Sequence, residues 1–244
     1  MRNNYRSFTA LFLMLCLILA LPAVGLAAET EREEPDWDLS PLPDEWFADA
    51  VFVGDSISFI LERQCELTGD LGDALFISES SLNIRSAVWG QLELWLQGRL
   101  CSLEDALPLI GAKKAFIMLG TNDIGQDGGI ELTMELWDEL VGRIREKDPE
   151  VQLFIQSCLP MYAAMEYEDL NNALIREYNE QLKAMCETYG FVYVDLADYF
   201  RDETGGVAEK FTADHYVHIN FDAAALWVEQ LRNPANYSMD PRSF

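Results

Sequence analysis

Basic side chains and histidine are scarce in this sequence. Its 244 residues include 17 Lys and Arg against 42 Asp and Glu, which gives a formal net charge of −25 at pH 7. Nucleic-acid-binding proteins carry basic patches and anionic lipid surfaces attract basic segments, so this balance argues against both kinds of partner. Only two histidines, His215 and His218, are present. Any chemistry that needs an imidazole base must therefore use one of these two residues.

Cysteine is also sparse, and none of the five cysteines forms a CxxC pair. This spacing does not favour a zinc site. Cys16 lies in an N-terminal apolar run, which leaves Cys65, Cys101, Cys158 and Cys186. In an exported protein four cysteines permit two disulfides with three connectivities. Each lies in an apolar context, so we favour four buried thiols and leave their pairing open.

The N-terminal residues 1–28 predict a signal peptide. Two arginines give a basic start, an apolar run covers residues 8–21, and small residues close the segment, so cleavage after Ala27 or Ala28 fits. An uncleaved membrane anchor is the alternative, because residues 8–28 approach the length that spans a bilayer. We expect a secreted or cell-surface protein in either case, with no other membrane association.

Residues 29–47 are acidic and contain three prolines, which predicts a linker, and residues 48–244 then form one domain. Within the domain, apolar strand-like runs alternate with helical stretches, without an internal repeat. This alternation predicts an α/β fold in which helices cover both faces of a parallel sheet. The expected strands are 51–53, 74–78, 114–119, 151–157 and 191–194; the expected helices are 57–67, 92–100, 103–110, 131–147, 170–189 and 222–232, the last capped by Asp222.

Three polar clusters lie where predicted strands end or where the last helix begins. They are Gly54-Asp55-Ser56, Gly120-Thr121-Asn122-Asp123, and the segment from Asp214 to Asn220. The carboxyl ends of parallel strands share one edge of a sheet, so these clusters can converge there. A serine nucleophile needs a base within hydrogen-bonding reach, and a histidine base needs a carboxylate to orient it. Ser56 is the candidate nucleophile, with an N-cap of the following helix as its alternative role.

The order of these clusters resembles the SGNH (GDSL-type) hydrolase family of esterases and acylhydrolases, over residues 48–232. The resemblance implies a flavodoxin-like three-layer α/β/α sandwich with a central, mostly parallel five-stranded sheet. It also implies a Ser-His-Asp triad without a metal ion or cofactor. In this sequence the triad would be Ser56, His218 and Asp214.

The same resemblance assigns the oxyanion hole and its supports. The backbone amide of Ser56 and the side-chain amide of Asn122 would stabilise the tetrahedral oxyanion. Gly54, Asp55, Gly120 and Asp123 would support these groups, with Asp55 bonding loop amides and Asp123 capping a turn.

Two features depart from the family pattern. The acid and base are usually three residues apart, whereas Asp214 precedes His218 by four and His215 occupies the usual position. We expect a loop expanded by one residue, with Asp214 still on the imidazole and His215 at the rim. The second family block usually supplies a glycine amide to the oxyanion hole, but the segment 79–83 lacks glycine. We assign this donor to Ser80.

These residues predict an exported serine esterase that hydrolyses a small acyl ester, such as an O-acetyl group on a carbohydrate. Two alternatives remain open. One is a catalytically silent carbohydrate-binding module on the same fold, which the two departures would explain. The other is a metal-dependent phosphoesterase with Asp55, Asp214, His215 and His218 as ligands. Residues outside the three clusters have simpler expected roles: Met161 and Tyr162 as core or pocket wall, and Asn171, Asn172 and Asn179 as solvated helix positions.

Overall fold

The computed structural model describes residues 35–80, 82–92 and 94–244, which form one compact unit. The predicted signal peptide and the first part of the predicted linker lie outside the described residues. Five parallel strands form the central sheet in the order β2-β1-β5-β6-β7. Their bounds are β1 Ala50–Gly54, β2 Leu75–Ser78, β5 Lys114–Met118, β6 Gln152–Gln156 and β7 Val192–Val194. The predicted α/β fold with a five-stranded sheet is confirmed, and the sheet is parallel throughout.

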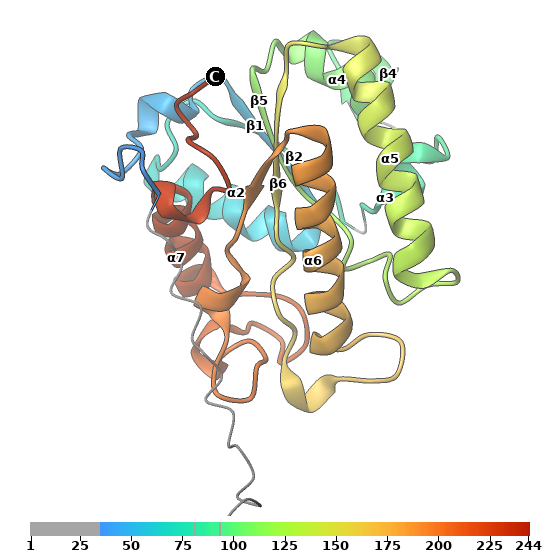
Figure 1. Cartoon of the computed structure of the whole chain (residues 1–244), viewed down its shortest axis with the longest axis vertical. Helices are drawn as coiled ribbons and strands as arrows, with labels where there is room; N and C mark the ends of the chain where they lie inside the picture. The colour runs from blue at the N-terminus through green and yellow to red at the C-terminus, as the bar shows by residue number, and fades with distance from the viewer. Residues whose placement is uncertain (1–34, 81, 93) are drawn as a thin grey trace, which may run out of the picture. The chain divides into compact units, whose positions relative to one another are not determined.

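Helices pack on both sides of this sheet (Figure 1). On one side α2 packs against α7; on the other α5 packs against α3, α4 and α6. The bounds are α2 Ser56–Thr68, α3 Ile84–Val88, α4 Leu103–Ile110, α5 Gly129–Lys147, α6 Asn172–Tyr189 and α7 Phe221–Leu231. Short 3₁₀ helices cover Asp44–Phe47 (η1), Ala163–Met165 (η2), Ala197–Phe200 (η3), Glu209–Phe211 (η4) and Pro234–Asn236 (η5).

A row of phenylalanines crosses the centre of the sheet. Phe52, Phe116 and Phe154 occupy paired positions on β1, β5 and β6. Their rings stack with centroid distances of 4.6 Å between Phe52 and Phe116 and 4.5 Å between Phe116 and Phe154. All three are buried. Since a slip of one residue would turn each ring to the other face, this row favours the observed register.

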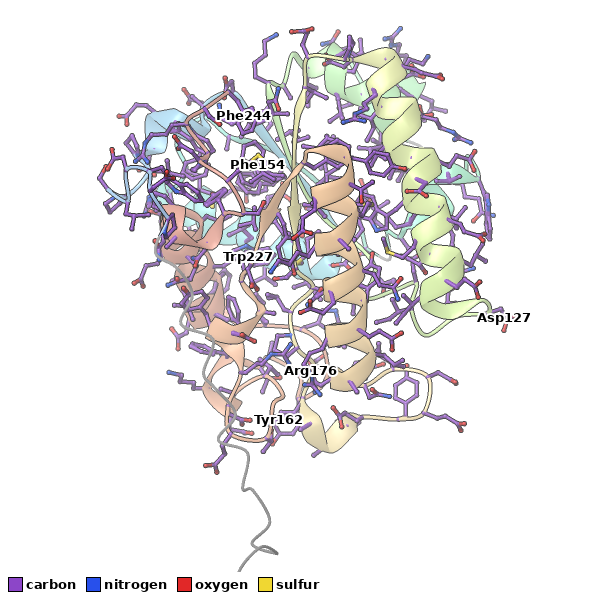
Figure 2. All side chains as sticks on the ribbon, in the orientation of Figure 1. Asp127, Phe154, Tyr162, Arg176, Trp227 and Phe244 are labelled. Atoms are coloured by element: carbon purple, nitrogen blue, oxygen red, sulfur yellow. The ribbon has the colours of Figure 1, made fainter. Side chains whose placement is uncertain are left out.

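The carboxyl ends of the strands meet at one edge, where the loops after β1, β5 and β6 begin. Figure 2 shows Tyr162, from the loop after β6, at this end of the domain and Phe244 at the opposite end. The C-terminal Phe244 ring lies 6.3 Å from that of Phe154. The polar clusters predicted from the sequence therefore share the edge that is far from the C-terminus.

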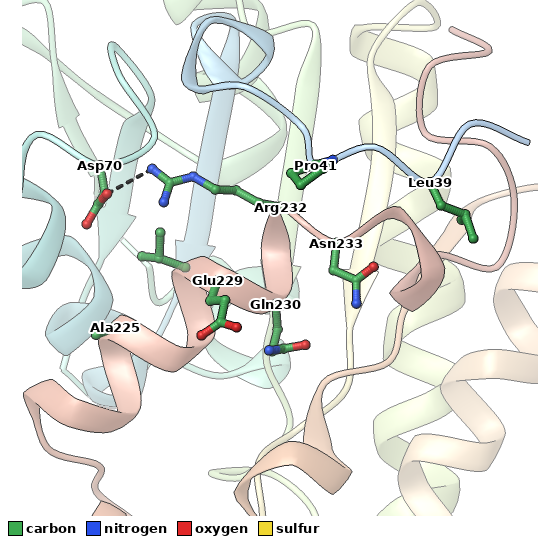
Figure 3. Close-up of a pocket in the computed structure, with 9 residues that line it drawn as sticks. Leu39, Pro41, Asp70, Ala225, Glu229, Gln230, Arg232 and Asn233 are labelled. Carbon is green, nitrogen blue, oxygen red and sulfur yellow. Dashed lines mark hydrogen bonds and ion pairs between the residues drawn. The ribbon is translucent and has the colours of Figure 1, made fainter.

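The domain begins before residue 48, so the predicted linker boundary is wrong. Leu42 and Phe47 are buried, and the Leu42 N–H donates to the Arg232 carbonyl (2.8 Å). The Arg232 guanidinium, just after α7, contacts Asp70 at 2.8 Å in a pocket that Leu39 and Pro41 also line (Figure 3). Arg232 also pairs with Asp44. The segment is acidic and Pro-rich on average, which is typical of a linker. Composition could not reveal these contacts, because only a few of its residues make them.

The helix predicted over residues 92–100 is also wrong. Leu94–Leu96 (β3) and Arg99–Cys101 (β4) form an antiparallel hairpin. Gln97 and Gly98 have φ angles of 49° and 80°, which is the left-handed pair that a two-residue hairpin turn requires. The leucine spacing matched a helix, but the Gln97-Gly98 turn reverses the chain and gives a hairpin instead.

The cap of the last helix differs from the prediction as well. The Asn220 side chain, rather than Asp222, caps α7 by accepting from the Ala223 N–H at 3.1 Å.

Candidate active site

Ser56 is the first residue of α2, and its hydroxyl is not used as a helix cap. The preceding residue, Asp55, is the N-cap and accepts from the Ile57 N–H at 2.9 Å. A side chain at Gly54 would meet the Ser58 hydroxyl at 1.9 Å, so this sharp strand-to-helix turn requires glycine. The alternative in which Ser56 only caps the helix is therefore excluded. Its half-buried hydroxyl is available to the loops above the sheet edge.

Ser56, His218 and Asp214 form a continuous hydrogen-bonded chain. The Ser56 Oγ lies 3.0 Å from His218 Nε2. The other ring nitrogen, Nδ1, lies 2.6 Å from Asp214 Oδ2. An ionised carboxylate can only accept, so Nδ1 carries a proton and Nε2 is left free to accept the serine proton. The geometry suits removal of that proton by the imidazole.

The loop accommodates the extra residue between the acid and the base. Asp214 Oδ1 accepts from the backbone N–H groups of Tyr216 (2.8 Å) and His218 (3.2 Å), while Oδ2 faces the imidazole. Although partial burial opposes the shift, the bonds from His218 and Tyr216 hold the pKa of Asp214 below its ordinary value. His215 has a φ of 55° and its ring turns to Glu209 Oε1 at 2.7 Å. The carboxylate that contacts the His218 imidazole is therefore that of Asp214, four residues earlier in the chain.

Asn122 lies next to Asp55, and both of its side-chain hydrogens are engaged. Its Nδ2 donates to Asp55 Oδ2 at 3.0 Å and to the Leu82 carbonyl at 3.3 Å. An oxyanion would have to share or replace one of these acceptors. Its role as an oxyanion donor therefore stays a prediction, and the sequence did not reveal its bond to Asp55.

Gly120 precedes Asn122 at the end of β5 and cannot carry a side chain. Its φ is 132°, and an added Cβ would lie 2.2 Å from the Tyr178 ring. The Tyr178 hydroxyl accepts from the Trp137 Nε1–H (2.6 Å) and donates to the Leu119 carbonyl (2.8 Å). This buried network fixes the turn that presents Asn122.

The two buried aspartates near the site have structural partners. Burial raises the pKa of Asp55 to about 6, against the bond from Ile57 and the nearby His218. Asp123 accepts from the first two N–H groups of α3, those of Ile84 (3.0 Å) and Arg85 (3.2 Å). Burial likewise raises the pKa of Asp123 to about 6, against those two bonds. Both carboxyl groups organise the backbone around Ser56 and Asn122.

Ser80 is an exposed residue in the turn between β2 and α3. The preceding Glu79 donates its N–H to the Gly54 carbonyl at 3.1 Å, so this turn starts beside the Ser56 loop. The Leu82 N–H closes the turn on the Glu79 carbonyl at 3.0 Å. The amide of Ser80 as an oxyanion donor stays a prediction.

The described residues offer neither a disulfide nor a cluster of metal ligands. In the described part of the chain all four cysteines are free thiols. Burial raises the pKa of Cys65, Cys158 and Cys186 to about 12, which keeps these thiols protonated. Within residues 35–80, 82–92 and 94–244, no three His, Cys, Asp or Glu side chains lie close enough to hold a metal ion. The four ligands of the phosphoesterase alternative thus do not converge.

Two asparagines expected to be solvated are buried instead. Asn172 pairs with the backbone N–H and carbonyl of Met161 at 3.0 and 2.9 Å, and Asn179 pairs with those of Cys158 at 2.8 and 2.9 Å. Asn171 caps α6. Helix periodicity places both asparagines on the face of Ile175 and Leu182, so their burial could have been predicted, but their backbone partners in the loop after β6 could not. The pairs fix the loop after β6, in which Met161 is buried and Tyr162 is partly exposed.

Comparison with known proteins identifies the family. A model of the GDSL-like Lipase/Acylhydrolase family matches residues 52–226. The chain belongs to this family. The match spans the Ser56 turn, the Asn122 turn and the Asp214–His218 loop. No curated protein matches this family member significantly.

Solved structures show the same fold at low identity. A protein of Streptococcus pneumoniae, provisionally named a platelet activating factor, is 19% identical with a TM-score of 0.60, covering 75% of this chain and 81% of the other. A GDSL-like lipase of Bacteroides thetaiotaomicron is 13% identical with a TM-score of 0.55, covering 80% and 89%. The catalytic domain of Streptococcus pneumoniae peptidoglycan O-acetyltransferase A is 15% identical with a TM-score of 0.52, covering 75% and 89%.

Of the helices in the part of the chain that the structure describes, none combines the length and the apolar character needed to traverse a bilayer.

Proposed function

We propose that this GDSL-family protein is an exported serine esterase that hydrolyses small acyl esters. The observation that carries the proposal is the chain from Ser56 Oγ through the His218 imidazole to Asp214, with contacts of 3.0 and 2.6 Å. Hydrogen-bond contacts of this kind between nucleophile, base and orienting acid are the signature of an activated serine. Export is proposed from the basic, apolar and small-residue order of residues 1–28.

The proposed reaction passes through an acyl-enzyme. His218 Nε2 takes the proton of Ser56 as Oγ attacks the ester carbonyl, and the resulting imidazolium is stabilised by Asp214. The oxyanion is stabilised by the Ser56 amide and by Asn122, with the Ser80 amide as a third donor. The imidazolium then protonates the leaving alcohol. Water, deprotonated by His218, hydrolyses the acyl-enzyme.

An O-acetyl group on a carbohydrate is the proposed natural ester. The fold that this chain shares with a peptidoglycan O-acetyltransferase domain supports this class. The formal charge of −25 disfavours an anionic substrate, because a strongly acidic protein repels anions.

Hydrolysis of p-nitrophenyl acetate by wild type, Ser56→Ala and Ser58→Ala tests the proposal. Ser58 is a matched control, since it lies two residues further along the same helix and is buried. We expect Ser56→Ala to lose at least ~1000-fold in kcat while Ser58→Ala stays within about tenfold of wild type. Activity should persist in the presence of a chelator.

Two results would contradict the esterase proposal. Equal activity of Ser56→Ala and wild type would exclude this nucleophile. A wild type without turnover, with glycan binding retained in Ser56→Ala, would instead favour the silent binding module.

A further inference from the structure

The loop that carries Asp214 and His218 contains a residue in an uncommon backbone conformation. His215 has a φ of 55°, in the left-handed region that residues other than glycine rarely adopt. It also lies between Asp214 and His218, which are four residues apart rather than three. Such a conformation persists only where neighbouring contacts hold it. The partners of His215 therefore bear on the position of the acid–base pair.

Three side chains form a closed cluster around this residue, which we call the Tyr162–Glu209–His215 cluster. His215 Nε2 lies 2.7 Å from Glu209 Oε1, and the Tyr162 hydroxyl donates to Glu209 Oε2 at 2.6 Å. The rings of Tyr162 and His215 meet edge to face, with centroids 5.2 Å apart. The bonds from Tyr162 and His215 lower the pKa of Glu209, which keeps this carboxylate ionised and accepting.

The cluster connects to the acid–base pair through the backbone of one residue, Tyr216. The Tyr162 N–H donates to the Tyr216 carbonyl at 2.7 Å. On its other side, the Tyr216 N–H donates to Asp214 Oδ1 at 2.8 Å. Tyr216 is therefore held by the cluster from one direction and by Asp214 from the other. Movement of the cluster would move the carboxylate that orients His218.

We propose that the Tyr162–Glu209–His215 cluster positions Asp214 against the His218 imidazole. The inference rests on the proposed roles of Asp214 and His218 but adds three positioning residues that do not touch the reacting atoms. In this protein the cluster holds the acid in place across a loop that is one residue longer than is usual in the family. His215 acts here as a ring that ties the loop to Glu209, and not as a second base.

Nuclear magnetic resonance of the untagged protein with ¹⁵N-labelled histidine tests the positioning directly. The protein has two histidines, so His215→Gly leaves the His218 imidazole as the sole histidine signal. Glycine adopts a positive φ without strain, so this variant removes the ring and keeps the loop conformation accessible. We expect the downfield Nδ1 proton signal of His218 to weaken or move upfield in His215→Gly and in Glu209→Gln. An unchanged signal in both variants would overturn the proposal, whether or not the protein is an esterase.

Kinetics provide a second readout with its own control. Ester hydrolysis by His215→Gly, His215→Ala and Glu209→Gln should show kcat lowered roughly threefold to tenfold, with KM within twofold, because each exposed contact is weak. Glu203→Gln is the matched control, since it removes the same charge from an exposed position of the neighbouring loop. This control should retain the wild-type kcat.

The pH profile gives a third readout of positioning. Loss of positioning weakens the stabilisation of the His218 imidazolium, so the acidic limb of kcat/KM should move to lower pH in His215→Gly. A limb that stays in place or moves to higher pH would contradict the proposal. Wild-type kinetics in His215→Gly with a loss in His215→Ala would show that only the backbone conformation matters, which overturns the cluster. Tyr162→Phe, which keeps the ring and removes the bond to Glu209, checks the result without altering the loop backbone.

Discussion

Replacement of Asp214 by asparagine should invert the tautomer of His218. Asp214 Oδ1 accepts two backbone N–H groups, from Tyr216 at 2.8 Å and from His218 at 3.2 Å. In Asp214→Asn the amide oxygen must stay at this position, because an NH₂ group would face two donors. The NH₂ group then faces Nδ1, which must become an acceptor, so Nε2 carries the proton and cannot accept one from Ser56.

The size of the loss distinguishes tautomer inversion from loss of one hydrogen bond. Removing a single charge-assisted bond costs about 1.5–3 kcal/mol, which corresponds to roughly 10–150-fold in rate. A histidine locked in the wrong tautomer costs about 10⁴-fold. The side chains of Asp214 and His218 are 37% and 39% exposed, so water will relieve part of this loss. We therefore expect kcat to fall roughly 10³-fold or more, with KM little changed.

Steady-state hydrolysis of p-nitrophenyl acetate measures this effect. Asp222→Asn is the matched control, since it makes the same change at an exposed position four residues beyond His218, and it should keep the wild-type kcat. A loss of 10–150-fold in Asp214→Asn would refute the tautomer argument. A loss below about tenfold would refute the role of Asp214 altogether.

Three further predictions concern the residues beneath the site. Asn122→Ala should lower kcat by ~100–1000-fold with little change in KM in steady-state kinetics, because an oxyanion donor acts mainly in the transition state. A rise in KM as large as the fall in kcat would contradict this. The raised pKa of Asp55, about 6, means that the folded state binds this proton more tightly than the unfolded chain, so stability should rise as the pH falls through 6. Between pH 7 and 5 the free energy of unfolding should gain ~1 kcal/mol from this group, and urea denaturation of Asp55→Asn should lack that gain. Gly120→Ala should lower the melting temperature sharply because its Cβ would lie 2.2 Å from the Tyr178 ring, and a wild-type melting curve would refute this packing argument.

The sequence carried enough information for the sheet and for the residues at its edge. Buried parallel strands are short apolar runs, and Gly54 and Gly120 mark sharp turns at two of their ends. Because such ends share one edge, the meeting of Ser56 with His218 followed from topology. The hydrogen-bond acceptors of Asn122 did not follow, since they depend on where the Leu82 carbonyl points.

Features that depend on a few tertiary contacts could not be predicted. The hairpin at 94–101 depends on a Gln97-Gly98 turn hidden among leucines at helical spacing. Phe47 joins the core from a segment whose composition is typical of a linker. Glu209 lies in a loop where sequence periodicity gives no signal, and its importance emerges only from its contacts with Tyr162 and His215.

The central claim is that Ser56 is a nucleophile activated by His218. Labelling with a fluorophosphonate, followed by proteolysis and mass spectrometry, tests it most directly, because the reagent reacts with activated serines. We expect a single adduct on Ser56, with labelling that slows as the pH falls and is lost in His218→Ala. An adduct on another residue, or labelling of Ser56 at the same rate in His218→Ala, would show that His218 does not activate Ser56.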